Sequence, residues 1–174
     1  MAQTIQNPIL KKIEAGIEAK IPPESRQQYM AIVVSGMQIM FSTGTRHLLM
    51  QKIQQPGDIV TKVSMGIAQL IGTIYNQAKG KMSVPEAIPA AITLAMQALD
   101  FAERMKVTPP VTGDVAAQVV QATAQATLKL FGIGRNKVQE VLSARQGSLT
   151  PQTMAPPTGA APPAAALVPQ LGAQ

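Results

Sequence analysis

Apolar residues recur every three or four positions along most of this chain, and prolines and glycines interrupt the pattern at short intervals. That spacing places apolar side chains on one face of an α-helix, whereas a β-strand would need strict alternation. The pattern predicts an all-α fold, a bundle of about six or seven helices without a sheet. The expected helices span residues 8–20, 23–42, 45–54, 59–78, 84–106, 114–131 and 135–145.

Several of these helices begin at recognisable capping residues. Asn7 precedes Pro8, a pairing typical of a helix start, and Asp58 is a good N-cap for the fourth helix. Ser83 and Glu86 stand three residues apart, which predicts a capping box at the start of the fifth helix.

Glycines are expected to end two helices, Gly44 the second and Gly80 the fourth. Asp100 and Arg104 are spaced to form an ion pair along the fifth helix. The expected inward residues of the fifth helix are Ile92, Met96, Leu99, Ala102 and Met105. Those of the sixth helix are Val115, Val119, Ala122, Ala126 and Leu130.

The composition changes abruptly after Gly147. Residues 148–174 carry no charge and are rich in proline and alanine. Proline lacks the amide donor of regular structure, so this segment is expected to be an extended low-complexity tail. The sequence therefore predicts a helical domain at 1–147 and a tail at 148–174.

Charged residues make up only 14% of the chain, compared with about 25% in ordinary soluble domains. A shortage of surface charge indicates that part of the surface meets protein or lipid. The net charge is +6, but the basic residues are scattered and aromatic residues make up only 3%, which argues against sequence-specific nucleic-acid binding. No signal-peptide core and no stretch of about 18 apolar residues is present.

The side chains that catalysis or metal binding requires are sparse. The chain has no cysteine, and its single histidine, His47, is expected to be solvated or to cap a helix. Glu14 and Glu18 could share a metal, but ion pairing with Lys11 on a solvated helix face is favoured. Gly132-Ile133-Gly134 follows a helix and lacks a third glycine, so it does not indicate a phosphate loop. We therefore predict no enzyme activity, no cofactor and no metal.

The fourth helix combines two faces that could pack. Beside its apolar face runs a line of small residues, Ser64, Ala68 and Gly72, and no charge occurs from Val63 to Ala78. Such a line lets another helix backbone approach closely. The sequence predicts either self-association through this line or its burial within one chain.

The run YMAIVVSGMQIM (29–40), the segment VPEAIPAAITLAMQALDFAERMK (84–106) and the low-complexity C-terminus resemble small internal virion proteins of short-tailed bacteriophages. The resemblance is to phages that package a virion RNA polymerase and covers about residues 8–145. It implies a multi-copy structural or ejection protein. Ejection proteins are stored near the portal, leave with the DNA and can assemble a conduit across the host envelope.

The leading hypothesis is therefore a non-enzymatic virion component. Its expected partners are other copies of itself, other virion proteins and the host membrane, and its expected location is the virion, then the host envelope after ejection. The alternative is a soluble helical adaptor or scaffold that binds one partner protein.

Overall fold

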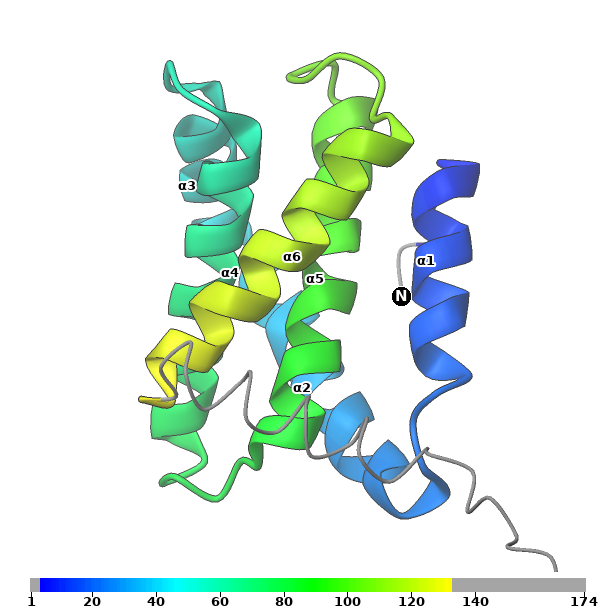
Figure 1. The fold of residues 1–174 in the computed structure, drawn as a ribbon. Helices are drawn as coiled ribbons and strands as arrows, with labels where there is room; N and C mark the ends of the chain where they lie inside the picture. The colour runs from blue at the N-terminus through cyan, green and yellow to red at the C-terminus, as the bar shows by residue number, and fades with distance from the viewer. Residues whose placement is uncertain (1–3, 133–174) are drawn as a thin grey trace, which may run out of the picture. The chain divides into compact units, whose positions relative to one another are not determined.

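The computed structural model describes residues 4–132, except the side chains of residues 46–50 and 52. This part of the chain is all-α and contains no strand, which confirms the expected fold class (Figure 1). The expected helix at 135–145 and the tail at 148–174 lie outside the described residues. The helices are α1 (Pro8–Glu18), α2 (Pro23–Phe41), α3 (Thr43–Gln54), α4 (Ile59–Gln77), α5 (Val84–Arg104) and α6 (Gly113–Leu130).

Helix α5 is the centre of the bundle. It packs against α1, α2, α4 and α6, and Figure 1 shows α1 on one side of it, α4 on the other and α6 crossing in front. Every residue from Thr93 to Ala102 is buried. Of the expected inward residues, Met96, Leu99 and Ala102 are buried, Ile92 is half-buried and Met105 is exposed. Thr93, Leu94 and Ala95 are also buried, on other sides of the helix. Small side chains let neighbours approach α5 from several directions, as its buried alanines Ala87, Ala90, Ala91, Ala95, Ala98 and Ala102 show.

The inner face of α6 also differs from the expected one. Val119 is buried as expected, but the other deeply buried positions near it are Ala116, Thr123 and Thr127, while Leu130 is exposed. Threonines of this size fill the contact with the neighbouring helices where larger side chains would hold α6 away.

Two of the expected caps form. The Asn7 Oδ1 accepts hydrogen bonds from the backbone N–H of Ile9 at 2.9 Å and of Leu10 at 3.3 Å. The Asp58 carboxylate accepts one from the Thr61 N–H at 2.8 Å. These bonds satisfy helix-start donors that have no partner within the helix.

The expected capping box at the start of α5 does not form. Ser83 is the N-cap residue, but its hydroxyl makes no capping hydrogen bond. Glu86 instead accepts a hydrogen bond from the Ser25 hydroxyl of α2 at 2.6 Å. A donor on the packed neighbouring helix thus takes the carboxylate away from its own helix start.

The expectation that Gly44 ends the second helix was wrong. Helix α2 ends at Phe41, where Ser42 adopts an extended backbone conformation, and Gly44 lies in the first turn of α3. The hydroxyls of Ser42 and Thr45 both donate to the Ile39 carbonyl. These local side-chain bonds compete with the helix and end it.

A lysine in the left-handed conformation follows the C-cap residue of both α4 and α5. Lys79 has φ of 52° and Lys106 has φ of 57°. Gly80 also has a positive φ, 75°, and its N–H donates to the Tyr75 carbonyl at 3.0 Å. Gly80 was therefore a correct sign of the helix end, but Lys79 takes the position where glycine is usual.

Candidate functional site

The line of small residues on α4 faces the interior of the chain at two of its three positions. Ser64 is buried, and its hydroxyl donates to the Thr61 carbonyl at 3.1 Å. A Cβ atom on Gly72 would lie 3.3 Å from Cδ1 of Leu130 on α6, and Ala68 between them is half-buried. Helix α6 of the same chain therefore covers part of this line. Self-association through Ser64, Ala68 and Gly72 stays a prediction.

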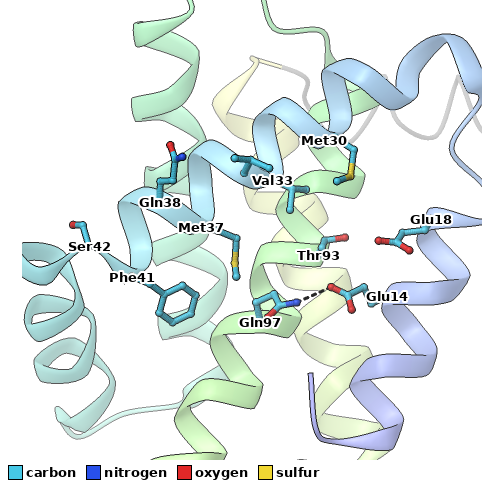
Figure 2. A pocket seen from close by; sticks show the side chains of 11 residues that line it. Glu14, Glu18, Met30, Val33, Met37, Gln38, Phe41, Ser42, Thr93 and Gln97 are labelled. Carbon is cyan, nitrogen blue, oxygen red and sulfur yellow. Dashed lines mark hydrogen bonds between the residues drawn. The ribbon is translucent and has the colours of Figure 1, made fainter. Parts of the chain in front are cut away.

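A groove lies between α1 and α2 in the described part of the chain, and α5 forms its floor (Figure 2). Its volume is about 590 Å³, and it is partly open to solvent. Helix α1 supplies acidic side chains, α2 supplies mostly apolar ones and α5 supplies polar ones. The residues that line it are Glu14, Glu18, Met30, Val33, Val34, Met37, Gln38, Phe41, Ser42, Thr93 and Gln97.

The α2 wall arises because α2 is apolar on more than one side. One side is buried against the bundle, and at Gly36 the helix comes so close to α5 that an added Cβ would lie 2.4 Å from Cδ1 of Leu94. The side toward the groove keeps Met30 and Val34 exposed, at 45% and 47%. The two side chains stand one helical turn apart, so they form an apolar surface that is available to another molecule.

The α1 wall carries two carboxylates. The Gln97 Nε2 donates to Glu14 Oε1 at 2.7 Å, so Glu14 reaches across to α5 (Figure 2). Among the described side chains, no lysine or arginine nitrogen lies within 4.0 Å of Glu14 or Glu18. The expected ion pairing with Lys11 is therefore not seen, because Glu14 turns toward the groove.

The environment of Glu14 favours its neutral form. Burial raises the pKa of Glu14 most, and the nearby negative charges of Glu18 and Asp100 raise it further. The hydrogen bond from Gln97 opposes these effects by stabilising the carboxylate. Glu14 is thus a partly desolvated acid that a cation in the groove would stabilise.

Asp100 fixes the start of α1 against α5. Its Oδ1 accepts hydrogen bonds from the backbone N–H of Gln6 at 2.8 Å and of Asn7 at 2.9 Å. The expected pairing with Arg104 is confirmed, with Nε 3.0 Å from Oδ2. The sequence could show the pair of charges but not the two backbone donors more than ninety positions away. This buried carboxylate thus helps to fix the position of α1, which carries Glu14 and Glu18.

The floor of the groove joins α2 to α5 through a hydroxyl pair. The hydroxyls of Tyr29 and Thr93 lie 2.9 Å apart and are buried. Burial raises the pKa of Tyr29, so this phenol is held in its protonated form. The bond holds the apolar wall at a fixed distance from the floor.

The other residues singled out in the sequence are described only in part. His47 lies in α3, but its side chain is outside the described ones. Gly132 follows the end of α6 with φ of 69°, and the two residues after it are not described. The described acidic side chains form no group of three that could hold a metal. None of the described helices is long and apolar enough to cross a membrane.

Comparison of the chain with protein-family models, curated proteins and solved structures finds no match.

Proposed function

We propose that this chain is a non-enzymatic assembly protein, a multi-copy structural or ejection component of a phage virion. The observation that carries the assembly role is the apolar side of α2, with Met30 and Val34 exposed beside the groove. No charge occurs between Gln27 and Thr45, so covering this side of α2 removes no charged group of α2 from water. A partner protein that covered it would gain the usual hydrophobic stabilisation.

The virion setting rests on the resemblance of residues 8–145 to internal virion proteins. Its partners in that setting are other copies of itself and other virion proteins, with the host membrane a further partner during ejection. The same setting places the protein in the particle and, after ejection, in the host envelope, where it helps to form a conduit for DNA.

Mass spectrometry of purified particles tests this role. We expect the chain in particles of the encoding phage in several copies per particle. Particles that lack the chain would overturn the virion role. Leakage of dye from liposomes on addition of the purified protein tests the conduit separately, because a passive structural part would leave the liposomes intact.

The groove favours a second candidate, a soluble helical adaptor or scaffold that binds one partner protein. An adaptor would form a complex of fixed stoichiometry and remain small by light scattering. A virion component would form rings or larger assemblies that are visible by electron microscopy.

A further inference from the structure

The groove between α1 and α2 has the length of a short helix. Its apolar wall runs along α2 from Met30 to Phe41, which at 1.5 Å per residue is about 16 Å, or three helical turns. Helices form its walls and floor, so no unpaired sheet edge is available to add a strand. Of the common modes of peptide recognition, this geometry fits a helix laid in a groove.

The apolar wall suits a partner helix better than an enclosed small molecule. The groove is partly open to solvent, whereas small-molecule sites bury most of their ligand. Met30 and Met37 supply flexible side chains that adapt to the shape of a partner. Val34, which is 47% exposed, adds apolar surface to the same wall.

The opposite wall defines the charge of the partner. Glu14 and Glu18 are four residues apart on α1, so they stand on one side of the helix, one turn from each other. The α2 wall carries no charge. An occupant therefore meets an acidic row on one flank only, although the chain as a whole has a net charge of +6.

A second copy of this chain fits the groove less well. The described helices turn their apolar faces into their own core, as Leu10 in α1 and Ile71 in α4 do. A free amphipathic helix from another protein does not have to leave a core in order to bind.

We propose that the groove between α1 and α2 binds an amphipathic helix of a partner protein. The apolar face of that helix covers Met30 and Val34, and lysine or arginine side chains along one flank meet Glu14 and Glu18. The inference deepens the proposed assembly role and rests on it, since both require a protein partner.

The test uses the full chain and two synthetic labelled peptides of four helical turns. Both have leucine along one face; one carries lysine at every fourth position along a flank, and the other carries glutamate at those positions. Fluorescence anisotropy measures their binding. We expect the lysine peptide to bind at least about tenfold more tightly at low salt and to weaken as salt rises, because exposed charges are screened.

Matched variants locate the binding. Glu18→Gln should weaken the lysine peptide about two- to fivefold, as expected for an exposed ion pair, while Asp114→Asn, which removes an exposed acid on α6, should change nothing. Val34→Lys should abolish binding. Met65→Lys on α4, where Met65 is 56% exposed, should leave it intact. Circular dichroism melting of each variant shows that it folds.

Several results would overturn the proposal. They are no binding of either peptide, equal binding of both peptides, or equal loss in Val34→Lys and Met65→Lys. If the chain self-associates without peptide and Val34→Lys abolishes this, the occupant of the groove is a second copy of the chain instead. If neither peptide binds but the chain is found in particles, only the groove proposal fails; if the chain is absent from particles but the lysine peptide binds, only the virion role fails.

Discussion

Helices α5 and α2 are both rich in apolar residues, but the bundle treats them differently. Helix α5 carries many alanines, and four neighbouring helices come close enough to bury it from Thr93 to Ala102. Helix α2 is buried on one side, and its Met30 and Val34 remain exposed beside the groove. The size of the side chains and the number of neighbouring helices therefore decide burial here, and hydropathy alone does not.

The largest expected effect separates these two helices directly. Leu94→Ala in α5 should lower the free energy of unfolding by about 3 kcal/mol, because Leu94 is fully buried and its loss leaves a cavity. Val34→Ala in α2 should change it by less than about 0.5 kcal/mol, because the side chain is half exposed. Chemical denaturation of both variants measures the difference. Equal losses would show that Val34 is covered in solution.

A pair of glycines tests how closely α2 approaches α5. Gly36→Ala would bring a Cβ within 2.4 Å of the buried Leu94, so we expect a loss of about 1–3 kcal/mol from overpacking. Gly16→Ala on α1 has open space around it and should stabilise the protein by about 0.5–1 kcal/mol, because alanine is the better helix former. Thermal melting compares the two. A neutral Gly36→Ala would mean that α2 can move away from α5.

Ala68→Leu tests whether the small-residue line on α4 is buried within the chain, as α5 is, or available to a partner, as one side of α2 is. Ser64 is buried and Gly72 lies against Leu130. We therefore expect overpacking to lower the free energy of unfolding by about 1–3 kcal/mol and to leave the mass of the protein in solution unchanged. Light scattering and thermal melting of the same variant measure both quantities. A smaller oligomer with near-normal melting would instead support self-association through the line.

The sequence predicted the helices well because their signals are local. Apolar spacing and the caps at Asn7 and Asp58 depend on residues within one or two turns, and both caps form. One error was local: Gly44 does not end α2, because the hydroxyls of Ser42 and Thr45 bond to the Ile39 carbonyl. Two other errors depend on distant residues. Ser25 takes Glu86 out of the expected capping box, and Gln97 takes Glu14 away from Lys11. No local pattern contains either partner.

The groove could not be predicted for the same reason. The sequence shows an uncharged, apolar stretch in α2 and two acids in α1, but not that they face each other. That arrangement depends on Asp100, which holds the backbone at Gln6 and Asn7, and on Thr93, which pairs with Tyr29. The fold brings these residues together from segments far apart in the chain.

The N-cap residues of α1 and α5 should differ in how much they stabilise the protein. Asn7→Ala should cost about 1 kcal/mol, because its side chain caps α1. Ser83→Ala at the start of α5 should cost close to nothing, because its hydroxyl makes no capping bond. Urea denaturation measures both. A loss at Ser83 as large as that at Asn7 would show that the capping box forms in solution after all.

The smallest expected effect concerns the charge of Glu14 in the groove. Burial raises its pKa in the folded protein above the ordinary value of 4.5. The folded state therefore binds a proton more tightly than the unfolded chain, and stability falls as pH rises from 4.5 through the raised pKa.

Glu14→Gln removes this penalty but keeps an oxygen that can accept from Gln97 Nε2. We expect the variant and the natural chain to melt alike below pH 4.5, and the variant to melt at a higher temperature at pH 7. Glu18→Gln, which removes an exposed charge one turn away, should show a smaller difference. The lysine peptide should stabilise the natural chain more than Glu14→Gln at pH 7, because the cation offsets the same penalty. The natural chain could instead have a higher melting temperature than Glu14→Gln at pH 7 without peptide. That result would show that the fold already stabilises the Glu14 carboxylate, so a cation in the groove would add little.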